Sequence, residues 1–287
     1  MSIAGQVKTR VQAGLSAVGR IPALVPILFD DRVQRVLRKL PGSGSLYGDG
    51  LQRRHPFDRA NGTDTSGSVL VEQMRIAHDH PAFATTVAYG GSQPSVIRAA
   101  IRALPSVDRA TFIDLGCGKG RPLLVATEFP FRDIVGVELA EDLAQIARAN
   151  AAAIAARHPE RKRARIEVGD AGAFPLPPGD LVLFMYYPFR SAMTARIVSA
   201  LERAIDQEPR AVYVIYVNPI DFALFDASPR LIRRWAHKVP HAREEVGYAP
   251  ESDDTVVIWQ GGTAPPPLEP ANGRIVAPPD SRAQLVD

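Results

Sequence analysis

Residues 113–121, IDLGCGKGR, are the feature of this sequence that most constrains its fold. An apolar run at 110–115 leads into three glycines at alternate positions, and a helix-forming segment, RPLLVATEF, follows at once. Glycine adopts backbone conformations closed to other residues, and the first turn of a helix offers free amide groups. The pattern therefore predicts a strand, a turn that lets a ligand approach the backbone closely, and a helix.

The alternation of strands and helices continues beyond this loop. Further apolar runs fit strands at 134–139, 165–168, 181–189 and 211–219, with helical segments between most of them, and two short strands at 243–250 and 255–260 are expected to close the sheet. Alternating strands and helices indicate a parallel sheet covered on both faces. We therefore expect an α/β fold with a doubly wound, mostly parallel seven-stranded sheet, an antiparallel closing strand and an N-terminal helical extension.

Composition divides the chain into three parts. Residues 1–84 combine amphipathic helical segments with glycine-rich turns, and we interpret them as a helical extension followed by lid loops. The regular strand and helix pattern occupies residues 85–262. Residues 263–287 are rich in proline and have little apolar periodicity, so we expect a disordered tail.

The charge is unevenly placed and favours certain partners. Residues 1–60 carry ten Lys and Arg against four Asp, whereas the net charge of the whole chain is +3. A basic arm of this kind suits peripheral contact with a membrane surface through residues 1–40, although a solvated helical extension is the plainer interpretation. Cys117 is the single cysteine, which excludes an internal disulfide and favours a reducing, cytoplasmic location. The apolar segment 21–29 is too short to span a bilayer.

The glycine spacing separates two classes of nucleotide-binding turn. A dinucleotide-binding turn reads GxGxxG, and its third glycine allows helix and strand to pack closely. Here Arg121 stands where that third glycine belongs. In addition Asp114, two residues before Gly116, would repel a diphosphate. A dehydrogenase is therefore the disfavoured alternative, and we expect a ligand that is uncharged or cationic at this end.

These features resemble the class I S-adenosylmethionine-dependent methyltransferases, whose first motif is an acidic residue followed by GxGxG. Residues 114–120 fit that motif, and the resemblance extends over roughly residues 85–262. Glu138 ends the second strand, where the family holds the ribose hydroxyls of the cofactor, and Asp170 follows the third strand, where the family caps the adenine. The resemblance implies methyl transfer with S-adenosyl-L-methionine as the cofactor. The chain also resembles a group of bacterial methyltransferases with an LGCGKGR loop and, more distantly, the non-SET protein-lysine methyltransferases.

The residues that the resemblance assigns to cofactor binding stand at strand ends or in the loops beside them. They are Thr65, Tyr89, Asp114, Gly116, Cys117, Gly118, Glu138, Leu139, Asp170, Ala171 and Tyr186. The chemistry of the acidic members fits independently, because a carboxylate accepts hydrogen bonds from two vicinal hydroxyls more strongly than neutral acceptors do. For Lys119 and Arg121 two interpretations stay open: packing against the preceding loop, or binding the carboxylate of the cofactor.

The fourth strand ends in YYPF, over the place where the methyl group would be transferred. Relatives that methylate nitrogen often have Asn or Asp, then Pro-Pro and an aromatic residue, at this place. The leading amide or acid is absent here, which disfavours nucleobase acceptors. An aromatic lip can hold a lysine or another amine, so Tyr186 and Tyr187 are candidates for positioning the acceptor, which we expect to be a protein or a small molecule and not a nucleic acid.

Three alternatives to this interpretation carry different requirements. A small-molecule O-methyltransferase needs a base near the acceptor. A binding protein that keeps the cofactor fold would act through its basic N-terminal arm on a membrane or a nucleic acid. A metal site at 78–80, His-Asp-His, has a spacing that favours no single helical face and lacks an evident third ligand, so we expect no metal.

Overall fold

The computed structural model describes residues 53–77, 79–186, 189–249 and 251–263, together with the backbone of two short strands at 274–276 and 284–286. The helices predicted within residues 1–40, and the candidate Tyr187, lie outside the described residues. Among the described residues no helix is long and apolar enough to cross a bilayer.

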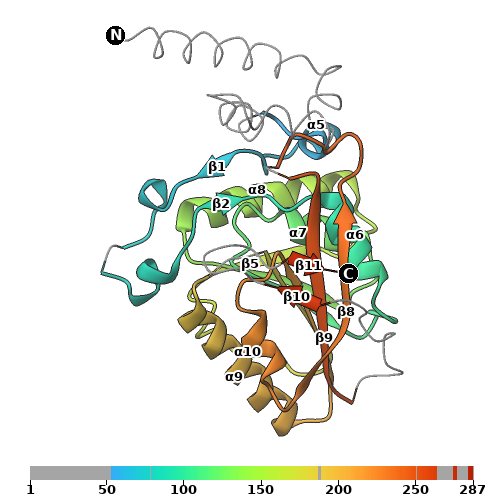
Figure 1. Ribbon diagram of the computed structural model, residues 1–287. Coiled ribbons are helices and arrows are strands. Elements are labelled where there is room, and N and C mark those ends of the chain that lie inside the picture. The colour runs from blue at the N-terminus through green and yellow to red at the C-terminus, as the bar shows by residue number, and fades with distance from the viewer. Residues whose placement is uncertain are drawn as a thin grey trace, which may run out of the picture.

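A central sheet of seven strands, in the order β5-β4-β3-β6-β7-β9-β8, carries the fold (Figure 1). The strands are β3 (Thr111–Leu115), β4 (Asp133–Glu138), β5 (Ala164–Val168), β6 (Leu181–Tyr186), β7 (Ala211–Val217), β8 (Leu231–Pro240) and β9 (Asp253–Gly262). The five strands β3 to β7 run parallel to one another, whereas β9 runs antiparallel to both β7 and β8. The predicted fold class is confirmed.

Helices cover both faces of this sheet (Figure 1). The helices are α5 (Pro56–Asn61), α6 (Pro94–Arg102), α7 (Arg121–Ala126), α8 (Glu141–Arg157), α9 (Ser191–Gln207) and α10 (Phe222–Asp226). Successive strand residues point to opposite faces, so Phe112 packs in the core under α6, α7 and α8 while Ile113 packs in the core under α9 and α10. Both side chains are fully buried.

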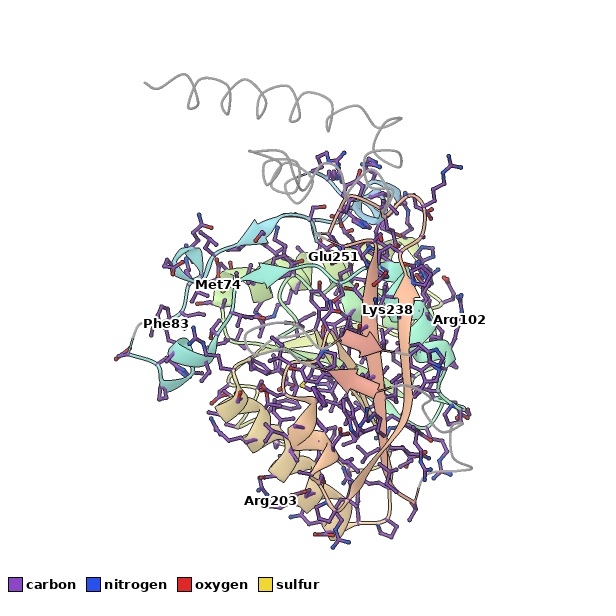
Figure 2. All side chains as sticks on the ribbon, in the orientation of Figure 1. Met74, Phe83, Arg102, Arg203, Lys238 and Glu251 are labelled. Atoms are coloured by element: carbon purple, nitrogen blue, oxygen red, sulfur yellow. The ribbon has the colours of Figure 1, made fainter. Side chains whose placement is uncertain are left out.

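Residues 62–92, which we call the cover segment, form an irregular layer across the carboxyl ends of the strands. They contain the short strands β1 (Ser68–Val69) and β2 (Tyr89–Gly90), which pair with each other, and two 3-10 turns, η1 (Val71–Gln73) and η2 (Pro81–Thr85). Met74 and Phe83 lie on this segment (Figure 2), and Met74 packs in a small apolar cluster with Leu143 of α8. The cover segment is thus part of the packed structure.

The strand predicted at 243–250 is wrong. Those of its residues that the structure describes form turns, and the strand that pairs with the outer side of β9 is β8, at 231–240. The sequence of β8, LIRRWAHKVP, alternates poorly because it carries cations on an edge strand and because a bulge between Arg233 and Trp235 shifts its register. In the turn region, buried Glu245 accepts hydrogen bonds from the start of α6, which holds that region against the helix.

Two short strands pair within the tail. β10 (Arg274–Val276) and β11 (Gln284–Val286) are antiparallel, a pairing that the weak apolar periodicity of this region did not predict. The rest of 264–287 lies outside the described residues.

We predict that Gly136→Ala destabilises the fold beneath the glycine loop. A Cβ at Gly136 of β4 would lie 2.4 Å from Leu123 Cδ1 and 2.8 Å from Cys117 Sγ, so the packed core would have to shift. Overpacking of this kind costs about 1–3 kcal/mol, which thermal or urea unfolding would detect. Gly90→Ala is the control, since its added Cβ meets no atom within 4 Å. Equal stability of the two variants would contradict this account.

Candidate functional site

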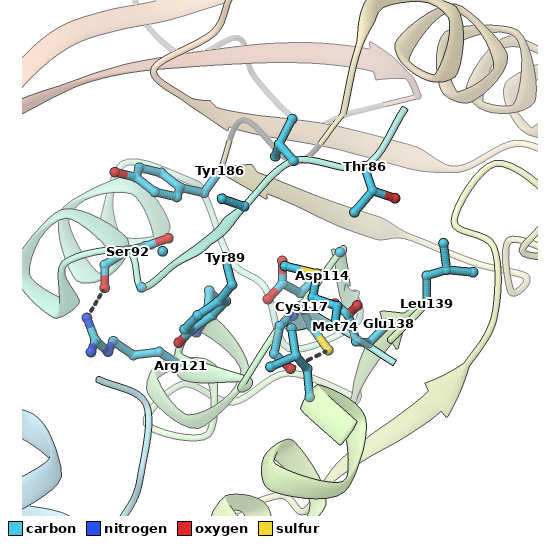
Figure 3. Close-up of a pocket in the computed structure, with 18 of the residues that line it drawn as sticks. Met74, Thr86, Tyr89, Ser92, Asp114, Cys117, Arg121, Glu138, Leu139 and Tyr186 are labelled. Carbon is cyan, nitrogen blue, oxygen red and sulfur yellow. Dashed lines mark hydrogen bonds between the residues drawn. The ribbon is translucent and has the colours of Figure 1, made fainter. Parts of the chain in front are cut away.

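A cavity of about 260 Å³ lies at the carboxyl edge of the sheet, beneath the cover segment. Of the residues predicted at the site, the cavity is lined by Tyr89, Asp114, Gly116, Cys117, Gly118, Glu138, Leu139, Asp170, Ala171 and Tyr186. Figure 3 places Tyr186 and Leu139 at opposite ends of the cavity, with Tyr89 and Asp114 between them. The structure therefore brings together residues from four strand ends, the glycine loop and the cover segment.

The glycine loop is held against the neighbouring strand by its own backbone. The amides of Gly116 and Cys117 both donate to the carbonyl oxygen of Val137, at 2.9 and 3.0 Å. Gly118 has φ of +54°, and a Cβ there would lie 2.3 Å from the ring of Tyr89. Only glycine meets both conditions, a left-handed backbone and a ring packed directly on the Cα atom.

The carboxylate of Glu138 joins the two turns that frame the cavity. Its Oε2 accepts a hydrogen bond of 2.7 Å from the amide of Gly118, and its Oε1 accepts one of 2.8 Å from the amide of Ala140 at the start of α8. Burial raises the pKa of this carboxyl, although the backbone hydrogen bonds from Ala140 and Gly118 act in the opposite direction. Each oxygen keeps a further lone pair for a ligand.

Asp114 is a buried carboxyl of the cavity with one unsatisfied oxygen atom. Its side chain is buried, and its Oδ2 accepts no hydrogen bond from the residues that the structure describes. Burial, and then the charge of Glu138, raise the pKa of Asp114 well above its usual range. A buried acceptor without a partner costs about 1–3 kcal/mol. The cavity is thus poised for a ligand that brings a cation or a hydrogen-bond donor to this carboxyl.

Asp170 follows β5 and faces the cavity with its neighbour Ala171. Its Oδ1 accepts a hydrogen bond of 2.8 Å from the amide of Gly172, and its Oδ2 pairs with Arg196 at 3.4 Å. These contacts fix the side chain in one orientation while it remains partly exposed.

The opposite end of the cavity is aromatic. Tyr186 ends β6, and Phe189 forms an isolated bridge with Thr86 of the cover segment. The cavity wall also includes Arg53, His55 and Tyr248, which the sequence did not single out. No local pattern marks these three, because they come from opposite ends of the chain and meet only in the fold.

His55 is held neutral in this wall. Its Nδ1 accepts a hydrogen bond of 3.1 Å from the amide of Phe57, which leaves Nε2 to donate to Gln93 Oε1 at 2.9 Å. Burial, followed by the charge of Arg121, lowers the pKa of His55 to about 3. Both ring nitrogens are therefore engaged and the ring carries no charge at neutral pH.

The structure does not bring Thr65 to the cavity wall, in contrast to its predicted place. Thr65 is fully buried behind the wall, where its hydroxyl donates to Asp58 at 2.7 Å and accepts from Arg121 Nε at 2.7 Å.

For Lys119 and Arg121 the structure favours packing against the preceding loop. Lys119 Nζ donates to the carbonyl of Ser66 at 2.8 Å, and Arg121 donates to Thr65 and Ser92.

No group of three or more potential metal ligands occurs among the described residues. His78, the first residue of the His-Asp-His sequence, lies outside them. The Nδ1 atom of His80 accepts a hydrogen bond from the amide of Ala82 and so caps the turn η2.

The chain is similar to known proteins in part of its sequence and in its structure. Residues 68–159 match the family model described as histone methylation protein DOT1. The fold is similar to that of TrmN from Thermus thermophilus, at 17% identity with a TM-score of 0.44, over 58% of this chain and 48% of that one. It is also similar to an RNA methyltransferase from Salinibacter ruber in complex with S-adenosyl-L-homocysteine, at 16% identity with a TM-score of 0.39, over 62% of this chain and 97% of that one.

The matched region spans about half the length of TrmN. No curated protein sequence matches the chain. At these identities and TM-scores the structural likeness does not bear on what this chain acts upon.

We predict that Asp114→Asn stabilises the ligand-free protein at alkaline pH. A carboxyl whose pKa is raised by folding contributes its stability below its unfolded pKa, about 4, and loses it as pH rises through the folded pKa. Because asparagine cannot ionise, the variant should melt at a higher temperature than the wild type at pH 8, with the difference shrinking towards pH 4.

Asp133→Asn is the matched control for this titration. Burial alone would raise the pKa of Asp133, but a hydrogen bond from Arg165, one from the backbone amide of Ile134 and the charge of Arg165 lower it. That variant should gain nothing at high pH. A melting temperature of Asp114→Asn below that of the wild type at pH 8 would contradict the burial of an ionisable, unpaired carboxyl.

Proposed function

We propose that this class I S-adenosylmethionine-dependent methyltransferase transfers a methyl group to a nitrogen atom of a protein side chain or a small amine. The observation that carries the proposal is the cavity itself: the buried Asp114, whose Oδ2 lacks a donor among the described residues, and the aromatic side chains of Tyr186 and Phe189 at the other end. The acceptor site and the roles of single residues follow from these two features.

The carboxylates of the cavity suit S-adenosylmethionine and disfavour a diphosphate. Asp114 offers a free acceptor oxygen to the cationic methionine end of the cofactor. Glu138, at the end of β4, has lone pairs left for the two ribose hydroxyls. Asp170 and Ala171, with Leu139 nearby, would hold the adenine. Figure 3 shows Asp114, Glu138 and Leu139 in this order along the cavity.

The aromatic end supports a nitrogen acceptor. When bound, S-adenosylmethionine supplies a methyl group already activated on a sulfonium, so the protein needs to orient an acceptor lone pair and exclude water. Tyr186 and Phe189 line this end of the cavity, and the ring face of Tyr186 can contact an amine. Tyr187 lies outside the described residues, so its proposed role rests on the sequence.

The alternative of a hydroxyl acceptor requires a base, and two lining residues are unavailable for that work. His55 uses both ring nitrogens. Tyr89 donates its hydroxyl to the carbonyl of Thr65 at 2.7 Å, and burial raises its pKa. An amine is a sufficient nucleophile once its lone pair is free, which favours nitrogen over oxygen.

We predict that Glu138→Ala and Asp170→Ala each weaken cofactor binding. Loss of a charged hydrogen-bond partner costs about 1.5–3 kcal/mol, and isothermal calorimetry with S-adenosylmethionine would measure it. Glu128→Ala is the control, because Glu128 pairs with Arg98 on the surface. Melting curves must show that each variant is folded. Unchanged affinity in both folded site variants would contradict the placement of the cofactor.

A methyl-transfer assay tests the acceptor. The purified protein is incubated with tritiated-methyl S-adenosylmethionine and lysate separated into protein, nucleic acid, lipid and small-molecule fractions. We expect label in protein or small amines, recovered as N-methyl compounds when the fraction is hydrolysed in acid and its products are separated by chromatography. Label confined to nucleic acid or lipid, carried on oxygen as a methyl ether, or lost in mild base as methyl esters are, would overturn the proposal.

The same assay separates the roles of the Tyr186 ring and hydroxyl. Tyr186→Phe keeps the aromatic face, whereas Tyr186→Ala removes it. We expect turnover to persist in the first variant and to fall steeply in the second, while cofactor affinity stays near the wild-type value. Equal turnover in all three proteins would show that Tyr186 does not position the acceptor.

A further inference from the structure

Lys119 and Arg121, the two cations of the glycine loop, donate hydrogen bonds to the cover segment, and Arg121 is also one of the residues that line the cavity. Arg121 begins α7, and its side chain is buried. Its Nε donates to Thr65 Oγ1 at 2.7 Å, its Nη2 to the carbonyl of Thr65 at 2.7 Å, and its Nη1 to the carbonyl of Ser92 at 3.1 Å. One guanidinium therefore links both ends of the cover segment to the helix behind the glycine loop.

The backbone at Gly91 is fitted to this guanidinium. A Cβ at Gly91 would lie 2.7 Å from Arg121 Cζ, so the planar group packs directly against the backbone at that point. Tyr89, two residues before Gly91, shares a hydrogen-bond acceptor with Arg121. Its hydroxyl donates to the same Thr65 carbonyl that Arg121 holds, and its ring lies on Gly118.

Thr65 is itself fixed from behind. Asp58 is fully buried and accepts hydrogen bonds from the amide and the hydroxyl of Thr65 and from the hydroxyls of Thr63 and Ser66. Burial alone would raise the pKa of Asp58, but these hydrogen bonds and the charge of Arg121 lower it below its usual value. The carboxylate thus stays charged opposite the guanidinium, with Thr65 between them.

Lys119 adds a second attachment on the same side. Its Nζ pairs with Asp64 Oδ1 at 3.1 Å, and Asn150 of α8 donates to the carbonyl of Asp64 at 2.8 Å. Between its ends the cover segment has a different attachment, since the amide of Arg190 donates to the carbonyl of Thr85 at 3.2 Å. Two attachments therefore lie beside Tyr89: Arg121, which donates to the same Thr65 carbonyl as the Tyr89 hydroxyl, and Lys119, whose Nζ lies 5.7 Å from the centroid of the Tyr89 ring.

We infer that Arg121 is a positioning residue that holds Tyr89 and residues 90–92 against the glycine loop, and so sets the affinity of the site for the methionine part of the cofactor. Arg121 acts through Tyr89 and the cover segment and does not itself contact the reacting atoms. The inference rests on the cofactor placement proposed above, with the methionine part beside Asp114 and Tyr89 and the adenosine part beside Glu138 and Leu139.

Two ligands that differ only in the amino-acid part test this inference. S-adenosylhomocysteine carries the full amino-acid chain, whereas 5′-methylthioadenosine keeps the nucleoside and lacks it. For Arg121→Lys, which keeps the charge but loses the planar fork, we expect the Kd of S-adenosylhomocysteine to rise about tenfold, in line with the loss of a charged hydrogen bond. The Kd of 5′-methylthioadenosine should change by less than about twofold, and Arg121→Gln should show a larger selective loss.

Arg132→Gln is the matched control. Arg132 also fastens a loop, donating to Thr111 Oγ1 at 3.0 Å and to the carbonyl of Pro178 at 2.7 Å, but at the opposite edge of the sheet. We expect it to lower the melting temperature while leaving both Kd values unchanged. A purely structural role of Arg121 predicts that both ligands weaken together.

Each outcome of the calorimetry decides the matter. A selective loss of S-adenosylhomocysteine affinity that Tyr89→Phe reproduces supports the inference, because that variant removes only the hydroxyl bonded to the Thr65 carbonyl. A selective loss in the Arg121 variants alone indicates direct contact with the ligand and overturns the positioning role. Equal weakening of both ligands, or no change in either, overturns it while leaving the cofactor assignment intact. Failure of the wild-type protein to bind S-adenosylhomocysteine would instead overturn the cofactor placement itself.

Discussion

The burial of two neighbouring carboxyl groups, Asp114 and Glu138, is the constraint on which the site depends. They stand at the ends of adjacent parallel strands, β3 and β4, where burial raises the pKa of both. Glu138 is compensated by two backbone amides, whereas Oδ2 of Asp114 has no donor among the described residues. Burying a carboxyl without a partner is costly, and a ligand with a cationic end removes that cost. The ends of these two strands thus account both for the geometry of the cavity and for its preference for a ligand with a positive charge.

The backbone and the side chains of the glycine loop make different contacts. Its backbone faces the cavity, while the side chains of Lys119 and Arg121 hold the cover segment. This division explains why arginine is acceptable at position 121, where a dinucleotide-binding turn has glycine. The close approach of helices occurs one residue earlier, at Gly120, where a Cβ would lie 3.2 Å from that of Ala147.

The sequence predicted the parts that depend on local pattern and chain order. The alternation of strands and helices was enough to predict the parallel sheet. Glu138 and Asp170 could be placed at its carboxyl edge because one ends β4 and the other follows β5. Prediction failed where the partners are distant along the chain. The burial of Thr65 depends on Asp58 and Arg121 together, which only the folded chain brings near. The strand β8 was missed because its bulge and its cations hide the alternation of an edge strand.

A crystal structure of the protein with S-adenosylhomocysteine would test the central claim most directly. The account predicts the ribose hydroxyls within about 3.2 Å of the Glu138 carboxylate and the ammonium group of the ligand on the Asp114 side of the cavity, directly or through one water molecule. A ligand bound with its nucleoside against Asp114, or bound outside this cavity with Asp114 still lacking a donor, would contradict it.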